Sequence, residues 1–487
     1  MTGPSPADVR RGRPSAVPAP RQTGPEPRPR ASADAVTALT VFLVLLFAIP
    51  SRLIFAPLGG AGSPAQLLGV AALLWWAATR LARGSRSSTR QPIRWAMGAF
   101  VVTNLISYIA ATIRPIDDVE LRAADRGLLS LLSWLGIVLL ACDGIPSRAR
   151  LDVLLRRLVI AGGCIAVLGL AQFFTHQAFV NYIQIPGLSQ NTDLGVVLNR
   201  DGFSRPAGTA LHPIEYGIVI TMMLPLALCY ALLDKHRPPL RRWWAVIPLA
   251  MAVPVSISRS AIVCTAVVMA VMLPALSRMI RRRAYLAIVV LLGAAFVAVP
   301  GIIGTLLGLF TGIGGDSSAQ SRTGSYALAW EFISRAPVFG RGFQTFLPQY
   351  RILDNQYLLS TIETGIVGVA AVLALFATGF ATARKVRRLT RDEPTRLLGQ
   401  AIAASILAGA ASFALFDALS FPQVANLVML MVGIAGAAYR LQVDGDTAVP
   451  RPAARHRKRP RAGIVSTASD GPSSRAQRAA GTAATAW

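Results

Sequence analysis

"LDNQYLLSTIETGIVG", residues 353–368, opens one of the longest apolar segments of this chain. It begins with a carboxylate, Asp354, and an amide, Asn355, and it is interrupted further on by Glu363 and two glycines. A helix needs about 20 predominantly apolar residues to cross the roughly 30 Å hydrocarbon core of a bilayer. The stretch therefore predicts a transmembrane helix over about 356–383 that starts with polar groups at the membrane surface.

Similar apolar segments recur along the 487 residues, of which 53% are hydrophobic and only 15% charged. This composition is too apolar for an ordinary soluble domain. The pattern predicts an all-α, polytopic integral membrane protein with about 12 transmembrane helices. The predicted spans are 36–56, 64–82, 94–113, 127–142, 153–174, 212–233, 243–258, 260–277, 284–309, 356–383, 397–416 and 421–439.

The formal net charge of +26 follows the predicted topology. With a cytoplasmic N-terminus, 38 of the 49 Lys and Arg residues fall in the inner segments, and every inner loop is basic. Cytoplasmic loops of membrane proteins carry such an excess. The charge therefore indicates an even number of spans with both termini cytoplasmic, rather than a nucleic-acid partner.

The two ends of the chain differ from its apolar middle. Residues 1–33 and 441–487 are basic and rich in Arg, Ser and Ala, which predicts disordered cytoplasmic tails around a transmembrane domain at 34–440. Two long outer loops are expected at about 175–211 and 310–355, and an outward-facing site is expected to be built there. The four cysteines form no CxxC motif, and no metal site is predicted.

The first long loop ends in "RDGFSRPAGTALHPIEYG", residues 200–217. A guanidinium near the outer interface can bind phosphate oxygens bidentately and keeps its charge at physiological pH. Arg205 is therefore a candidate phosphate ligand, with snorkelling to lipid headgroups as the alternative. His212 and Glu215 are secondary candidates for proton transfer, although a His before Pro at a helix start is often a cap.

A second motif is "PVSISRSAIV", residues 254–263, in which Arg259 occupies a short turn between two apolar spans. A proline and three serines interrupt the helix there, so the backbone at this point is expected to line something polar. A charge this close to the membrane plane needs a partner. The candidates are an anionic ligand, which we favour, and a carboxylate such as Glu215 or Asp417.

A third motif lies in the long loop 314–359. Its spacing predicts an interfacial amphipathic helix over 325–333 that presents on one face Tyr326, Ala329, Trp330 and Ile333. Arg322, at the start of this helix, is a candidate to cap it, to pair with Asp316 or to contact phosphate. The Gly-rich "PVFGRGF" that follows predicts a surface turn whose backbone is able to approach a ligand.

Together, "SRPAGTALHP", "SISRSA", "SRTGSYALAWEFISRAPVFGRGF" and "DNQYLLSTIETGIVG" resemble the O-antigen ligase and polymerase superfamily of bacterial envelope enzymes, over about residues 190–383. The resemblance implies a GT-C-like membrane fold, with a large outer loop containing short helices between spans nine and ten. It also implies metal-independent, inverting glycosyl transfer at the outer face of the bacterial cytoplasmic membrane, with no cofactor. The donor would be a glycan on undecaprenyl diphosphate, and the acceptor a sugar hydroxyl.

The resemblance also assigns roles to residues. Arginines of the family engage the donor diphosphate, and Arg205 and Arg259 occupy the matching motifs, with Arg322 as a further candidate. In the ligases a histidine precedes the asparagine of the last motif. Here Asn355 fits, but the histidine position is Asp354.

Asp354 is the candidate catalytic base, because a carboxylate can accept the proton of an attacking hydroxyl. Helix capping is the alternative role for this residue. Asn355 and Glu363 are secondary candidates, and Glu363 is expected to face the bundle interior. The glycines at 365 and 368 predict a close helix-packing surface.

Because the ligase histidine is absent, we favour polymerisation of an exopolysaccharide or O-antigen-like glycan. A ligase, a transporter of lipid-linked glycan without chemistry and an inert scaffold are the alternatives. The expected partners are the lipid-linked oligosaccharide donor, the glycan acceptor and membrane lipids, without nucleic acid. Other polysaccharide export or assembly proteins are further candidate partners.

Overall fold

The computed structural model describes residues 34–83, 91–191, 198–200, 202–311 and 324–448. The chain divides into a compact unit, Met1–Gly445, and a second unit, Asp446–Trp487. The helix bundle and the candidate site belong to the first unit. The predicted tail at 1–33 and all but the first eight residues of the predicted tail at 441–487 lie outside the described residues.

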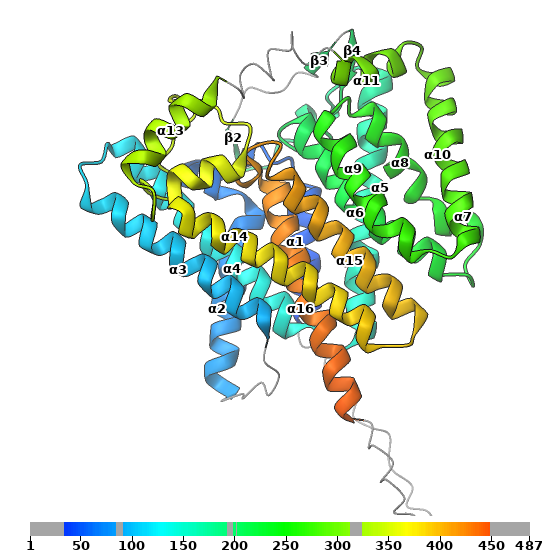
Figure 1. Ribbon diagram of the computed structural model, residues 1–487, viewed down its shortest axis with the longest axis horizontal. Coiled ribbons are helices and arrows are strands. Elements are labelled where there is room, and N and C mark those ends of the chain that lie inside the picture. The colour runs from blue at the N-terminus through cyan, green and yellow to red at the C-terminus, as the bar shows by residue number, and fades with distance from the viewer. Residues whose placement is uncertain (1–33, 84–90, 192–197, 201, 312–323, 449–487) are drawn as a thin grey trace, which may run out of the picture. The chain divides into compact units, whose positions relative to one another are not determined.

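Helices dominate the described chain (Figure 1). They are α1 (Ala35–Phe47), α2 (Pro64–Arg83), α3 (Pro92–Ile113), α4 (Asp118–Gly144), α5 (Arg148–Thr175), α6 (Pro213–Leu233), α7 (Pro239–Trp243), α8 (Val246–Val255), α9 (Arg259–Met272), α10 (Arg278–Ala298), α11 (Ile302–Thr311), α13 (Ser325–Arg335), α14 (Gln356–Leu389), α15 (Glu393–Ser412) and α16 (Pro422–Ala448). Short 3-10 turns are η1 (Ala56–Gly62), η2 (Phe179–Tyr182), η3 (Leu273–Ala275) and η5 (Ala418–Ser420). Two small antiparallel sheets pair β1 (Leu53–Ile54) with β2 (Ser189–Gln190) and β3 (Leu198–Arg200) with β4 (Phe203–Arg205).

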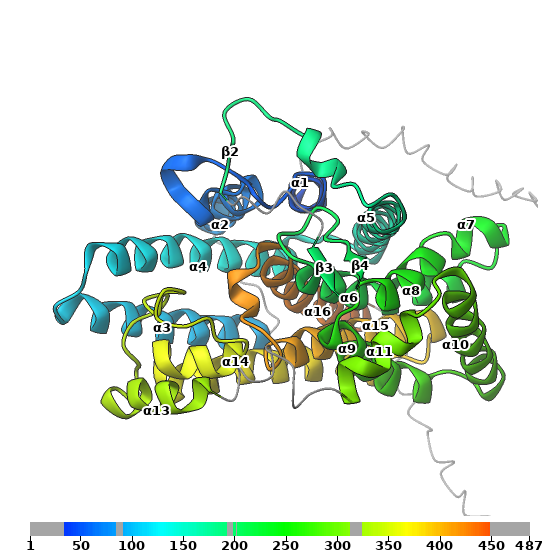
Figure 2. The ribbon, with the colours of Figure 1, turned by 90° about the horizontal axis from the view of Figure 1, so that it is seen from above.

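The core of the bundle lies around α6 and α16, which are buried on nearly all sides. Helix α14 contacts α3 and α15, and α15 in turn contacts α6 and α9. In two perpendicular views, α2, α3 and α4 lie on one side of α14 to α16, and α7 to α11 lie on the other (Figures 1 and 2). A helix that is apolar all round needs this kind of enclosure, whereas α10 has no buried residue and is open to its surroundings.

Seven of the described helices are long and apolar enough to cross a membrane, namely α2, α3, α4, α5, α6, α14 and α16. The pair α10 and α11 would count as an eighth span, although it is bent by 115°. Helices α1, α8 and α9 are shorter; α1 ends at Phe47, three residues before Pro50, which is unable to continue a helix. The prediction of an all-α polytopic membrane protein is confirmed, while the number of twelve spans stays a prediction.

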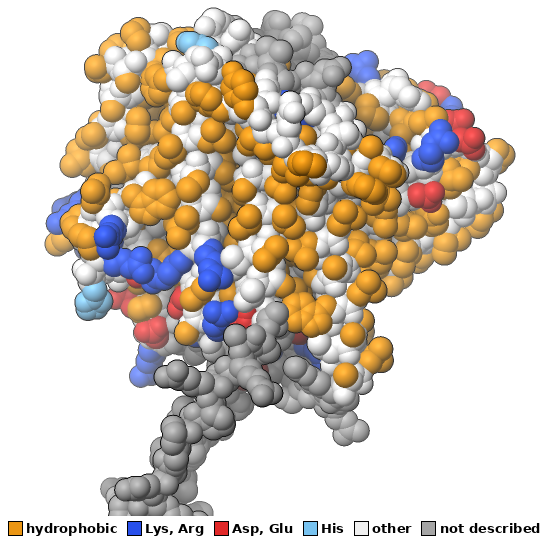
Figure 3. All heavy atoms as spheres, turned by 180° about the vertical axis from the view of Figure 1, so that it is seen from behind, with side chains coloured by type: hydrophobic (Ala, Val, Ile, Leu, Met, Phe, Trp, Pro, Cys, Tyr) orange, Lys and Arg blue, Asp and Glu red, His pale blue; other side chains and the backbone are white. Residues whose placement is uncertain are grey.

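The surface agrees with a membrane setting. On the face drawn in Figure 3, hydrophobic side chains cover the middle, and Lys and Arg side chains gather toward the lower edge. Apolar atoms facing lipid and basic groups at helix ends are typical of transmembrane bundles.

Helix α13 confirms the helix predicted at 325–333. Its Ala329 is buried in a small hydrophobic cluster, whereas Tyr326 and Trp330 are exposed. The other buried members of this cluster are Phe346, Leu353, Leu359 and Ile362. The predicted single face is therefore divided: α13 packs on the start of α14 through Ala329 and leaves its two large aromatic side chains outside.

Candidate functional site

Arg205 lies at the end of β4. Two hydrogen bonds between the Gln172 side chain and the Gly208 backbone, here called the Gln172 clamp, hold the segment that follows it. The Gln172 side chain of α5 accepts a hydrogen bond from the Gly208 N–H at 2.8 Å and donates one to the Gly208 carbonyl at 3.1 Å. Gly208 has φ +59°, and a Cβ there would lie 3.0 Å from the Tyr216 ring. A left-handed conformation in so tight a space favours glycine. The segment after Arg205 is thus held against α5 and α6.

His212 caps α6, as the alternative interpretation of this residue predicted. Its Nδ1 accepts a hydrogen bond from the Ile214 N–H at 3.1 Å. Burial, with a smaller contribution from the positive charge of Arg205, lowers the pKa of His212 from 6.5 to about 4. The ring is therefore neutral at physiological pH, and Arg205 is close enough to influence it.

The α15–α16 connector, defined here as residues 413–423 so that it includes the first two residues of α16, joins two of the predicted motifs. Both carboxylate oxygens of Glu215 accept backbone hydrogen bonds, one of them from the Gln423 N–H at 2.6 Å. At the other side of the connector, the Gln356 side chain accepts a hydrogen bond from the Leu419 N–H at 2.9 Å. The first turn of α6 and the first turn of α14 are therefore bonded to the same short segment. In these contacts Glu215 accepts hydrogen bonds from backbone N–H groups and not from a side chain.

Arg259 is the first residue of α9, directly after the break that separates α9 from α8. The Ser258 hydroxyl caps α9 by accepting a hydrogen bond from the Ala261 N–H at 3.4 Å. Ile257 is buried with φ +43°, a strained conformation for a β-branched residue. Gly217 of α6 packs against this break, since a Cβ there would lie 2.8 Å from the Ala261 Cβ. The predicted interruption is confirmed, and it brings Arg259 to the first turns of α6.

Asn355, and not Asp354, is the N-cap of α14, because the Asn355 side chain accepts a hydrogen bond from the Leu358 N–H at 3.1 Å. The capping alternative for Asp354 is therefore wrong. Asp354 is half-buried beside the connector. Burial, with a smaller contribution from the charge of Asp354, raises the pKa of Asp417 from 3.8 to about 7. The two carboxyl groups are thus electrostatic neighbours.

A cavity of about 270 Å³ lies next to the connector and the first turns of α14. Glu363 and Asp417 both line it and interact electrostatically with each other. The other polar lining residues are Gln66, Arg126, Ser130, Gln344, Arg351 and Ser420, and the aromatic ones are Trp134 and Phe346. Among the described lining residues, neither Asp354 nor the two motif arginines is included. The structure thus makes both Asp354 and Glu363 electrostatic neighbours of Asp417, while Arg205 and Arg259 lie around the start of α6.

The Gly-rich turn docks its backbone directly onto α14. The Gly342 N–H donates to the Glu363 carbonyl at 2.9 Å. Gly365 has φ +66°, and a Cβ there would lie 2.2 Å from the Val338 carbonyl oxygen. Gly365 is therefore required by a contact between a loop and a helix. The interpretation of this glycine as part of a helix-packing surface is wrong.

Residues 244–373 match the family model described as O-antigen ligase. This match supports the O-antigen ligase and polymerase superfamily for this part of the chain. The O-antigen ligase match includes Arg259, Asp354 and Glu363, whereas Arg205 and His212 precede it. Members of the superfamily are glycan-processing enzymes, so the chain has a role in glycan transfer at a membrane. No curated protein matches the chain in sequence at a significant level.

Several residues near the O-antigen ligase motifs were not predicted from the sequence. Glu120 of α4 accepts a hydrogen bond from Arg114 at 2.6 Å and forms an ion pair with Arg341. It also accepts a hydrogen bond from the Tyr350 hydroxyl. This cluster ties the loop between α13 and α14 to α3 and α4. Each of its members appears in the sequence as an ordinary loop or helix-end polar residue, so no local signal identifies the set. Asp417 did have a signal, since it is an acid between two apolar spans.

Arg322 lies outside the described residues. Among the residues that the structure describes, no group of three His, Cys, Asp or Glu side chains is arranged to hold a metal ion.

Proposed function

We propose that this protein polymerises a lipid-linked glycan at the outer face of the bacterial cytoplasmic membrane. It would transfer a glycan from undecaprenyl diphosphate to a sugar hydroxyl of another lipid-linked glycan, with inversion and without a metal ion. The observation that carries this proposal is the connector 413–423. It bonds the helix start that follows Arg205 to the helix start that follows Asp354, and so gathers the motifs at one end of the bundle.

The proposed role of Arg205 and Arg259 is to bind the donor diphosphate. Negative charge accumulates on this leaving group as its bond to the anomeric carbon breaks. Guanidinium groups held in place stabilise the transition state more than the ground state, and this difference raises the rate. The Gln172 clamp and the Ser258 cap support such positioning, because they restrain the backbone next to each arginine. Arg322 is a third candidate for the same role.

The proposed role of Asp354 is to take the proton of the acceptor hydroxyl. The hydroxyl oxygen then forms a bond to the anomeric carbon, and the diphosphate leaves from the opposite face with the bonding electrons. Asp417 supports this assignment, because burial raises its pKa to about 7, so the carboxyl group beside Asp354 is partly neutral near physiological pH.

The cavity lined by Glu363 and Asp417 is the candidate site for the part of the acceptor glycan next to the reacting sugar, because Asp354 is not among its described lining residues. Its volume of about 270 Å³ is near the lower end of the range for small-molecule pockets, about 300 to 1,000 Å³. Amides, hydroxyls and charged groups alternate in its wall with Trp134 and Phe346. Such a lining offers hydrogen bonds to sugar hydroxyls and an aromatic surface for a sugar ring.

Ligation of the glycan to a final anchor is the second candidate, because the matching family model is described as O-antigen ligase. Movement of lipid-linked glycan without chemistry is the alternative from another class. These functions differ in the product that accumulates when the protein fails.

The test is glycan size profiling in a deletion strain that carries Asp354→Asn, Arg205→Ala or Arg259→Ala. We expect single repeat units to accumulate on the carrier. Arg335→Ala is the matched control, since Arg335 is exposed on α13 and forms an ion pair with Glu331 of the same helix. Long carrier-linked polymer that never reaches an anchor would indicate a ligase instead. Normal polymer from all three variants at normal protein levels would exclude the catalytic proposal.

A further inference from the structure

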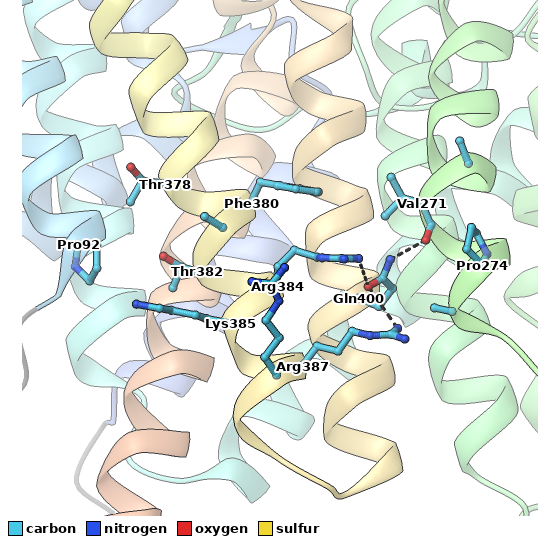
Figure 4. A pocket seen from close by; sticks show the side chains of 14 residues that line it. Pro92, Val271, Pro274, Thr378, Phe380, Thr382, Arg384, Lys385, Arg387 and Gln400 are labelled. Atoms are coloured by element: carbon cyan, nitrogen blue, oxygen red, sulfur yellow. Dashed lines mark hydrogen bonds between the residues drawn. The ribbon is translucent and has the colours of Figure 1, made fainter.

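A second pocket, of about 890 Å³, lies at the other end of α14, between α14, α15 and the end of α9 (Figure 4). Four basic residues near the C-terminal end of α14 line it, namely Arg384, Lys385, Arg387 and Arg388. Among the described residues of its lining there is no Asp or Glu. The pocket is thus a concentrated positive site, separate from the O-antigen ligase motifs.

Gln400 of α15 organises two of these charges. Its side-chain oxygen accepts hydrogen bonds from Arg384 at 2.8 Å and from Arg387 at 3.3 Å, and its amide nitrogen donates to the Val271 carbonyl (Figure 4). An amide oxygen carries no net charge, so these bonds orient the guanidinium groups without neutralising them. The pocket therefore keeps its positive charge available to an anion.

Lys385 faces another neighbour. Its ammonium group lies 5.6 Å from the centre of the Tyr439 ring of α16. An aromatic ring attracts a cation without neutralising it. In Figure 4 the Lys385 side chain extends away from Gln400, on the opposite side of α14 from the two arginines. The basic side chains therefore lie on more than one side of the α14 end, and the partners described for them, an amide and an aromatic ring, carry no negative charge.

Apart from Thr378 and Thr382, the rest of the described lining is apolar. It includes Phe380 and Ala381 of α14 and Ala270 and Val271 of α9. The pocket thus combines a cationic rim at the helix ends with an apolar wall along the predicted membrane interior. Free phosphate would use only the rim, whereas an amphiphile would use both parts.

We propose that this pocket binds an anionic phospholipid, with its phosphate against Arg384 and Arg387 and an acyl chain along the Phe380 wall. Arginine forks match phosphate oxygens bidentately. Basic pockets between transmembrane helices are suited to such headgroups when they lie at the cytoplasmic side, where the predicted topology puts the residues after α14. The inference does not depend on the glycan reaction, because it concerns only this end of the bundle.

The experiment measures the thermal unfolding midpoint of the purified full chain in detergent, with phosphatidylglycerol, phosphatidylcholine or inorganic phosphate added at equal concentrations. We expect a saturable rise with phosphatidylglycerol only. Equal effects of the two lipids would overturn the proposal, and so would an equal effect of inorganic phosphate, which would make the pocket a free-anion site.

Variants locate the effect. Arg384→Gln combined with Arg387→Gln is expected to raise the half-saturating phosphatidylglycerol concentration at least about tenfold, because two charge-assisted hydrogen bonds are lost. Arg391→Gln is the matched control, since Arg391 is exposed and is not among the lining residues. A double variant that responds like this control would overturn the proposal.

Gln400→Glu separates lost binding from lost folding. The new carboxylate has nearly the shape of the amide and would pair with Arg384 and Arg387, so it would compete with a phosphate without creating a cavity. It also loses the hydrogen bond to the Val271 carbonyl, so its elution profile is the check that the variant folds. We expect a protein that elutes as the wild type does and needs at least about tenfold more phosphatidylglycerol. An unchanged response would contradict the proposed position of the headgroup.

Discussion

At the end of the bundle where α6, α9 and α14 begin, buried carboxyl groups lie beside arginines and helix breaks. At the end where α14 finishes, four basic side chains line a pocket, and the amide of Gln400 is a shared partner of two of them. The first end mixes acids, bases and exposed backbone within a small region. The described lining of the second pocket holds charge of one sign, and all four of its basic residues are on α14.

This difference has a physical reason. Group transfer needs a proton acceptor next to a positive site for the leaving group, so opposite charges have to be kept apart by backbone bonds. Binding an anion needs only unneutralised positive charge in a defined geometry. The strained turn at Ile257 and the left-handed Gly365 occur at the first end, where the backbone changes direction.

The largest effect is expected from Asp354→Asn. Loss of the proton acceptor should lower glycan transfer by about 10²-fold or more, with little effect on folding, because Asn355 provides the helix cap. The measurement is the rate of polymer formation by purified protein from lipid-linked repeat units. Arg391→Ala, a charge change at the opposite end, is the control and should keep the wild-type rate. Equal rates for the two variants would remove the functional distinction between the ends.

Gly365→Ala is expected to have the largest effect on stability. The positive φ and the 2.2 Å approach to the Val338 carbonyl oxygen together should lower the free energy of unfolding by at least about 2 kcal/mol. Gly98→Ala is the control, since a Cβ at Gly98 in α3 meets nothing within 4 Å and should be neutral or stabilising by about 0.5–1 kcal/mol. Thermal unfolding of both proteins in the same detergent checks this. A tolerated Gly365→Ala would mean that the loop does not dock on α14 as described.

Asn355→Ala is expected to lower the free energy of unfolding by about 1 kcal/mol through loss of the helix cap. Asn355→Asp should retain most of that stability, because a carboxylate also accepts the Leu358 N–H. Denaturant or thermal unfolding compares the two variants. If Asn355→Asp is as unstable as Asn355→Ala, the side chain has a role other than capping.

The last expected effect concerns the pH dependence of stability. Since the pKa of Asp417 is raised from 3.8 to about 7, its neutral form is preferred in the folded state. This contribution to stability is fully present below about pH 3.8 and is lost as the pH rises through about 7. The pKa of His212 is lowered to about 4, so its contribution has the opposite sign and is lost as the pH falls from 6.5 through 4.

Asp417→Asn separates these two contributions. The variant should lose the part of the decline in unfolding temperature that the wild type shows between about pH 4 and 7, and the difference between the two proteins should grow with pH. A constant difference across this range would show that Asp417 does not titrate there.

Some site features were predictable from short sequence patterns. The break at "SISRSA" is visible because a proline and serines interrupt an apolar run, and the helix at 325–333 follows from its spacing. The choice between Asp354 and Asn355 as the cap was not predictable, because both residue types accept backbone N–H groups at a helix start. The start of α14 at Gln356 decides the choice, because it makes Asn355 the residue directly before the helix.

The sequence by itself determined that this is a helical membrane protein, since apolar run lengths and the distribution of Arg and Lys are local properties that a bilayer constrains directly. It also determined the O-antigen ligase resemblance through several short motifs. Tertiary structure alone decided that residues 413–423 join the starts of α6 and α14, that Asp417 is an electrostatic neighbour of both Asp354 and Glu363, and that the end of α14 forms a basic pocket with Gln400. These contacts join residues far apart in the chain, and no local pattern of hydrophobicity or charge specifies which helix ends meet.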